Sequence, residues 1–172
     1  MIAEMNARGT PFIGLLYAGL ALTDHGSRVI EFNVRFGDPE TQVLIPLLKT
    51  PLASLLFKAA TGGLADAVLE WADQSAVTVV LAADGYPAAP QSGAEISNIP
   101  QAENVNVFYA GISQSGESLF ASGGRVLSVS GIGADLTEAR DRAYRVISQI
   151  SLPGSFYRSD IALNASVAEK GN

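Results

Sequence analysis

The sequence predicts an α+β fold, with helices set beside mostly antiparallel strands. A turn sequence at residues 24–27 separates two apolar runs, and residues 37–41 form a strand-to-helix junction. Beyond residue 76, several short β-rich runs precede one amphipathic helix. Strands that follow one another through tight turns pair antiparallel, and segregated strands and helices are typical of α+β proteins. A chain of 172 residues has room for one ordinary domain or two small ones.

Composition excludes several classes of protein. The chain is 48% hydrophobic and 16% charged, which indicates a folded chain with a core. The net charge of −6, without a basic block, argues against nucleic acid or an anionic membrane as a partner. There is no cysteine, which excludes disulfides and thiol catalysis and fits a cytoplasmic location. The single histidine, His25, excludes a multi-histidine metal site.

The apolar run near the start does not predict a membrane span. It covers 15 uncharged residues between Arg8 and Asp24, whereas a span needs about 20. A secretory signal is the alternative, with Arg8 before an apolar stretch at 12–22. Glu4 and the lack of a small-residue cleavage site count against it.

Residues 12–23 and 28–36 are predicted as two strands of a hairpin, joined by a turn in which Gly26 supplies a positive φ. Side chains alternate between the faces of a strand. The second strand therefore has an apolar face, expected in the core, and a polar face. The apolar face carries Ile30, Phe32, Val34 and Phe36, and the polar face carries Glu31, Asn33 and Arg35.

A helix is expected directly after the hairpin. Asp38 is a suitable N-cap, Pro39 suits the first helical position, and Glu40 favours the positive end of the helix dipole. Pro46 should kink this helix and Pro51 should end it. A second helix is expected at 52–60, closed by glycines, while 64–73 stays open between helix and strand.

The remaining residues predict a second strand-rich part. Strands are expected at 76–82, 104–112, 118–121 and 125–130, and a long loop at 84–93. An amphipathic helix is expected at 136–150, capped by Asp135 or Thr137. Residues 166–172 are expected to be a frayed tail.

The polar face of the second strand suits a metal and an anion. Magnesium prefers oxygen ligands, often one or two from the protein with the rest from phosphate and water, and Glu31 and Asn33 supply such oxygens. Arg35 can bind phosphate or carboxylate oxygens in a bidentate manner. The expected helix N-terminus would also favour an anion. From spacing alone, the solvated face of an amphipathic strand stays an open alternative, as does a capping role for Asp38.

The segment Glu31 to Gln42 reads EFNVRFGDPETQ and resembles the signature of phosphoribosylamine–glycine ligase, an ATP-grasp enzyme of purine biosynthesis. Four further segments resemble landmarks of the same family and occur in the expected order: 14–20, 84–87, 123–127 and 156–161. The resemblance covers nearly the whole chain. It implies that residues 1–62 end an ATP-grasp domain with an antiparallel hairpin plus helices. Residues 63–75 would be a linker, 76–165 a small mixed α/β C-terminal domain, and 166–172 a tail.

The resemblance also implies a reaction. ATP would phosphorylate the carboxylate of glycine, and the amine of 5-phosphoribosylamine would attack the acyl phosphate to give glycinamide ribonucleotide, ADP and phosphate. Glu31 and Asn33 would hold Mg²⁺ or Mn²⁺ against ATP, with Arg35 also contacting the nucleotide. Arg35 and Asp38 would be catalytic. The substrates would be bound by Arg35, Gly37, Asp38, Pro39 and Glu40.

Family members are more than twice as long, so the chain is expected to be a carboxy-terminal fragment that needs the amino-terminal part of the ligase as a partner. Alone, it is expected to be inactive. The alternative hypothesis is a non-catalytic binding module derived from the ligase. Such a module would self-associate through an exposed apolar surface.

Overall fold

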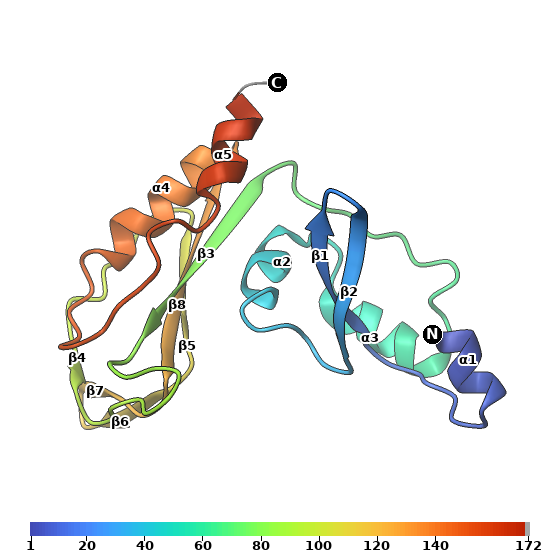
Figure 1. Ribbon diagram of the computed structural model, residues 1–172, viewed down its shortest axis with the longest axis horizontal. Helices are drawn as coiled ribbons and strands as arrows, with labels where there is room; N and C mark the ends of the chain where they lie inside the picture. The colour runs from blue at the N-terminus through green and yellow to red at the C-terminus, as the bar shows by residue number, and fades with distance from the viewer. Residues whose placement is uncertain (171–172) are drawn as a thin grey trace. The chain divides into compact units, whose positions relative to one another are not determined.

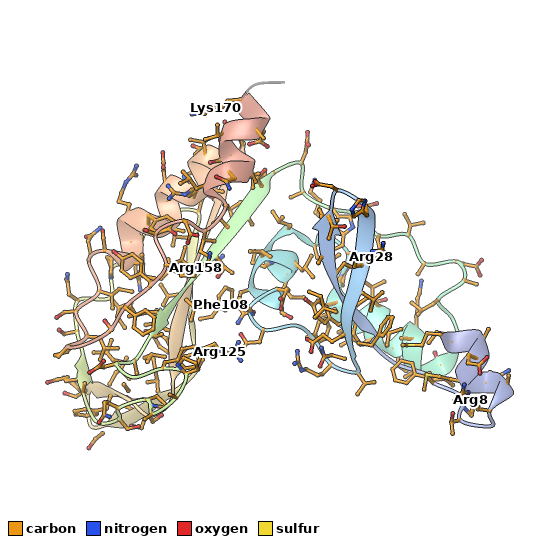
Figure 2. All side chains as sticks on the ribbon, in the orientation of Figure 1. Arg8, Arg28, Phe108, Arg125, Arg158 and Lys170 are labelled. Carbon is orange, nitrogen blue, oxygen red and sulfur yellow. The ribbon has the colours of Figure 1, made fainter. Side chains whose placement is uncertain are left out.

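The computed structural model describes residues 1–170, which divide into two compact units. The first unit comprises residues 1–41 and 48–71, and the second comprises residues 42–47 and those from Ala72 onward. Each unit contains helices and antiparallel strands, so the predicted α+β class is confirmed (Figure 1). Along residues 1–170, no helix has both the length and the apolar character needed to cross a bilayer.

The first unit contains the predicted hairpin. Strands β1 (Tyr17–Thr23) and β2 (Gly26–Asn33) pair antiparallel, and Gly26 has φ 89° in the turn. Both strands are shorter than expected, because β1 begins only at Tyr17 and β2 ends at Asn33. The register shifts between Gly19 and Leu20, where Ile30 is the additional residue of a β-bulge on β2.

The apolar face of this hairpin is exposed, so the prediction that it belongs to a core is wrong for this chain. The exposed fractions are 70% for Ile30, 41% for Phe32 and 68% for Val34. Leu20 and Val29, which pair across the strands, are 53% and 56% exposed. Alternation correctly separates apolar from polar side chains, but it does not determine whether another element covers the apolar face.

The junction after the hairpin differs from the prediction. Helix α2 (Thr41–Leu47) begins at Thr41, and residues 38–40 form a turn in which the Asp38–Pro39 peptide bond is cis. Pro39 is therefore not the first helical residue and Asp38 is not the N-cap. Pro46 lies inside α2 as expected. Helix α3 (Leu52–Thr61) matches its prediction and ends at Gly62, whose φ is 79°.

Outside the hairpin, the first unit also contains a short helix α1 (Ile2–Ala7). Residues 64–70, which the sequence left open, form neither a helix nor a strand. An isolated bridge joins Leu48 to Trp71, and the amide of Lys49 donates to the carbonyl of Glu70 at 2.9 Å.

The second unit is built on a three-stranded antiparallel sheet with β8 (Arg125–Gly133) at its centre. Strands β3 (Ser75–Ala82) and β5 (Val105–Tyr109) flank it. Helix α4 (Leu136–Ile147) lies along one face of this sheet (Figure 1). The approach is close, because a Cβ placed on Gly131 would lie 2.2 Å from the carbonyl oxygen of Ala139.

A second small sheet has the order β4–β7–β6, formed by Glu95–Ile96, Ser118–Ala121 and Ile112–Ser115. The single strand expected at 104–112 is therefore divided between two sheets. The division occurs at Gly111, where a Cβ would lie 2.7 Å from the Cα of Gly123. A glycine at this crossing lets two backbone segments approach closely, and the strand cannot continue straight.

The N-terminus of α4 is capped more fully than predicted. The carboxylate of Asp135 accepts from the Glu138 amide at 2.7 Å, which confirms Asp135 as a cap. Glu138 in turn accepts from the Ala134 amide at 2.8 Å. Glu169 accepts from the Leu136 amide at 2.8 Å, and it belongs to helix α5 (Leu163–Lys170). Residues 166–170, expected as tail, are therefore helical, while positions 171–172 lie outside the described residues.

Candidate functional site

The predicted metal ligands lie together on one face of β2. The side-chain amide of Asn33 donates to Oε1 of Glu31 at 2.8 Å. The exposed position of Glu31 leaves its carboxylate open to solvent. The carboxylate of Glu31 and the side-chain amide of Asn33 are thus held side by side, with the amide nitrogen toward the carboxylate.

A glycine on β1 makes room for this carboxylate. Gly19 pairs with Glu31 across the hairpin, and a Cβ on Gly19 would lie 3.1 Å from Cγ of Glu31. Gly19 is one of the few buried residues of the first unit. The side chain of Glu31 therefore lies across β1, where a larger residue would displace it.

The turn after β2 is tied back to β1 by a tyrosine. The phenol of Tyr17 donates to Oε1 of Glu40 at 3.0 Å, and both residues are half-buried. This hydrogen bond raises the pKa of Tyr17, and burial adds to the effect. The charge of Glu31 raises this pKa further, and the charge of Arg35 opposes the increase. The phenol thus lies within the electrostatic influence of three predicted site residues.

Arg35 and Asp38 lie beyond the end of β2. The guanidinium of Arg35 donates to the backbone carbonyl of Phe36 at 2.9 Å, and the residue is exposed. Asp38 is exposed in the turn before α2, next to the half-buried Pro39. Gly37 is buried, and its carbonyl accepts from the Thr41 amide at 3.2 Å. Two of the predicted site residues are thus held by side-chain hydrogen bonds within this unit: Glu31 accepts from Asn33, and Glu40 accepts from Tyr17.

The donor set fits a magnesium or manganese ion that is shared with a phosphate. Among residues 1–170, no cluster of three or more histidine, cysteine, aspartate or glutamate side chains could hold a metal. Two protein oxygens, from Glu31 and Asn33, match the common magnesium arrangement in which phosphate and water complete the coordination. Glu31 and Asn33 would therefore supply only part of the coordination of such an ion, and other groups would complete it.

Tyr17 and Gly19 were not among the residues that the sequence indicated for the site. Both belong to the polar face of β1, since they pair with Asn33 and Glu31. The alternation of residues 17–20, with Ala18 and Leu20 on the opposite face, is the signal that could have found them. This alternation was missed because a single uninterrupted strand was expected to start at residue 12.

Comparison with known proteins gives two family matches that together cover most of the chain. Residues 1–41 match the model described as "Phosphoribosylglycinamide synthetase, ATP-grasp (A) domain". Residues 76–164 match the model described as "Phosphoribosylglycinamide synthetase, C domain". The hairpin with its carboxylate–amide pair is thus the end of an ATP-grasp domain, as the sequence predicted.

The chain belongs to the phosphoribosylglycinamide synthetase family. It is 56% identical over 173 residues to a phosphoribosylamine–glycine ligase of Streptomyces coelicolor, covering 97% of this chain and 42% of that protein. It is 52% identical over 166 residues to the ligase of Mycobacterium tuberculosis strain H37Rv, covering 95% of this chain and 39% of that protein.

A solved structure agrees with the sequence relatives. The crystal structure of phosphoribosylamine–glycine ligase from Thermotoga maritima matches with a TM-score of 0.81 and 38% identity. The match covers 93% of this chain and 40% of that one. The chain thus spans about two fifths of the length of the ligases that it matches.

Proposed function

We propose that this chain provides the carboxy-terminal share of a phosphoribosylamine–glycine ligase. The reaction would consume ATP, glycine and 5-phosphoribosylamine, and it would yield glycinamide ribonucleotide, ADP and phosphate. The partner would be the amino-terminal part of the ligase, which this chain does not match. We propose the cytoplasm as the compartment, in keeping with a chain that has no cysteine.

In this proposal the polar face of the hairpin handles the phosphates. Glu31 and Asn33 would hold Mg²⁺ or Mn²⁺, which neutralises charge on the transferred phosphoryl group. Arg35 would turn from the Phe36 carbonyl to bind a phosphate or carboxylate oxygen, since a guanidinium can fork onto either. Asp38 and Glu40 would orient the substrates at the Gly37–Glu40 turn. Positioning and charge stabilisation supply most of the catalysis in phosphoryl transfer.

One observation carries the proposal. The Glu31–Asn33 pair, joined at 2.8 Å, lies on the strand that leads into the Gly37–Glu40 turn, within the segment that matches the family's ATP-grasp domain. The pair also lies beside the buried Gly19 of β1, which leaves room for the side chain of Glu31. In this proposal the carboxylate of Glu31 and the amide oxygen of Asn33 would be two ligands of a metal whose coordination phosphate and water complete.

The test measures glycine-dependent ADP release. The chain is mixed with the amino-terminal part of the Streptomyces coelicolor ligase that it does not match, together with ATP, Mg²⁺, glycine and fresh 5-phosphoribosylamine. We expect release in the mixture and a loss of at least roughly 100-fold in Glu31→Ala, since removing a metal ligand costs more than removing an outer-shell partner. The control is Glu103→Ala, an exposed carboxylate on a loop of the second unit. A folded mixture without glycine-dependent release would refute the proposal.

The exposed apolar face of the hairpin favours a second candidate function, a non-catalytic module that associates with a second copy of the chain. This face carries no charged side chain, so two copies can meet there without opposing like charges. Leu22, at 86% exposed, lies at its edge. We expect sedimentation at tens of micromolar, where exposed apolar surfaces associate, to detect a dimer. Ile30→Asp should abolish it and Val167→Asp, on α5, should not. A monomer at these concentrations would exclude this candidate.

A further inference from the structure

Tyr17 occupies the start of β1 and reaches across 23 residues of sequence to Glu40. Its hydroxyl donates to Oε1 of Glu40 at 3.0 Å. Its Cα partner across the hairpin is Asn33, one of the two proposed metal ligands. One side chain therefore connects the strand pair of the site with the turn that follows it.

The turn itself is built so that Glu40 can fold back. A Cβ on Gly37 would lie 2.4 Å from Oε2 of Glu40, so only glycine leaves room for the carboxylate in this position. The Gly37 carbonyl accepts two hydrogen bonds, from the amide of Thr41 at 3.2 Å and from its hydroxyl at 2.5 Å. Thr41 thus closes the turn, and the Tyr17–Glu40 bond anchors the closed turn to β1.

The phenol of Tyr17 is the donor in its bond to Glu40. The bond to Glu40 raises the pKa of the phenol, burial adds to this, and the carboxylate of Glu31 raises it again. Arg35 acts in the opposite sense. A neutral phenol can donate to a carboxylate, and such a charge-assisted bond is stronger than one between neutral groups.

We propose that Tyr17 is a positioning residue that, through Glu40, fixes the Gly37–Glu40 turn against the strand that bears Glu31 and Asn33. Tyr17 itself touches neither metal nor substrate in this role. Its structural effect on the turn stands by itself, whereas its effect on turnover rests on the proposed ligase function. The turn would then be held in place before a substrate arrives, which is how positioning contributes to rate.

The first experiment is a double-mutant cycle on the 172-residue chain, read out by hydrogen exchange of the Thr41 amide. The four proteins are the wild type, Tyr17→Phe, Glu40→Ala and the double variant. We expect each single variant to speed exchange roughly 2- to 10-fold, the range for losing one hydrogen bond. The double variant should be no faster than Glu40→Ala alone, because both substitutions remove the same bond.

Two further variants separate this hydrogen bond from general loosening. Glu40→Gln keeps a side-chain oxygen that can accept from the phenol, so exchange should return toward the wild-type rate. Tyr109→Phe removes a hydroxyl from an exposed tyrosine of the second unit and should change nothing. Additive effects in the cycle, or unchanged exchange in Tyr17→Phe, would overturn the proposal.

The second experiment uses the reconstituted ligase mixture described above. Tyr17→Phe should lower kcat while the KM for ATP stays unchanged, and Glu40→Gln should retain more activity than Glu40→Ala. A higher KM for ATP with normal kcat would contradict the positioning role. If the wild-type mixture releases no ADP, the ligase proposal fails, whereas the exchange cycle on the chain alone still decides the role of Tyr17.

Discussion

Two glycines leave room for two acidic side chains, Glu31 in the hairpin and Glu40 in the turn that follows it. Gly19 leaves space beneath Glu31, and Gly37 leaves space for Glu40 to fold back. Neither glycine has a positive φ, so their backbone conformation does not require glycine. The missing side chain is what matters at both positions, since the carboxylates occupy the vacated volume.

We expect Gly19→Ala to weaken metal binding. The new methyl group would press on Cγ of Glu31 from 3.1 Å and move its carboxylate away from Asn33. Affinity for Mn²⁺ in the presence of ATP should fall roughly tenfold, the lower end of the range for disturbing a group that supports a ligand. Electron paramagnetic resonance of free Mn²⁺ measures it. The control is Gly63→Ala, where the added atom meets Lys58 at an ordinary 3.7 Å.

A second prediction concerns the exposed pair of Arg158 and Asp160. The guanidinium nitrogens donate to both carboxylate oxygens at 2.9 and 2.7 Å, and this bidentate bond lowers the pKa of Asp160. Because the pKa of Asp160 is lowered in the folded state, the pair stabilises the fold at pH values above the ordinary pKa of aspartate. This stabilisation is lost as the pH falls through the lowered pKa. We expect a carboxyl NMR titration to give a higher midpoint in Arg158→Gln. The control is Arg8→Gln, which breaks only the ion pair with Glu4 and should leave the titration midpoint of Asp160 unchanged.

The proximity of Glu31 and Asn33 was predictable from the sequence, because strand alternation places residues 31 and 33 on one face, whatever the tertiary structure. The residues of β1 that face them, Tyr17 and Gly19, were not predictable, because they depend on the register of the hairpin. That register includes a bulge, which one extra residue in β2 creates without a distinctive sequence. The prediction that Asp38 is the N-cap was wrong because α2 starts only at Thr41, three residues further on.

At the scale of elements, helix α4 is capped at its N-terminus by several carboxylates. Three carboxylates accept from backbone amides at its N-terminus, and one of them, Glu169, belongs to α5. Unsatisfied amides at a helix N-terminus cost free energy, and carboxylates there also favour the helix dipole. The capping by Asp135 and Glu138 follows a local sequence pattern, whereas Glu169 lies 33 residues from its partner Leu136 and could not be foreseen.

We expect Asp135→Ala to lower the free energy of unfolding by about 1 kcal/mol, the usual cost of losing an N-cap. Urea unfolding followed by far-ultraviolet circular dichroism measures the change. Asp141→Ala, at an exposed position in the middle of the same helix, is the matched control and should have little effect. Equal losses in the two variants would show that the cap contributes nothing of its own.

The contact between β8 and α4 gives a stronger prediction. A Cβ on Gly131 would lie 2.2 Å from the Ala139 carbonyl oxygen and 2.7 Å from the Ala143 amide nitrogen. Backbone atoms cannot move aside as a flexible side chain can, so Gly131→Ala must separate the helix from the sheet. We expect a loss of roughly 1–3 kcal/mol, as for overpacked cores. Gly63→Ala again provides the control, and urea unfolding is the measurement.

At the scale of the whole molecule, the described core is confined to the second unit. The buried apolar side chains of the described residues lie between residues 77 and 152. In the first unit, over residues 1–41 and 48–71, the only buried residues are Gly19 and Gly37. Burial of apolar surface is the main favourable contribution to folding, so the first unit has much less to stabilise it.

We expect the two units to unfold separately, the first at the lower urea concentration. The single tryptophan, Trp71, belongs to the first unit and reports on it by fluorescence. Circular dichroism should show a second transition at higher urea, and Asp135→Ala should shift only that transition. Coincident transitions by both methods would instead indicate one cooperative domain.

The bulge at Ile30 also affects which changes of length the hairpin can accept. It puts Glu31 and Arg28 on the same face although they are three residues apart, because Gly19 pairs with Glu31 and Ala21 with Arg28. Removing one residue between the turn and Glu31 can therefore be absorbed by restoring a regular ladder, with Glu31 and Asn33 still facing Tyr17 and Gly19. A residue removed between Glu31 and Asn33 has no such compensation, since it moves one ligand to the apolar face. Homologous hairpins should accordingly differ in length only on the turn side of Glu31.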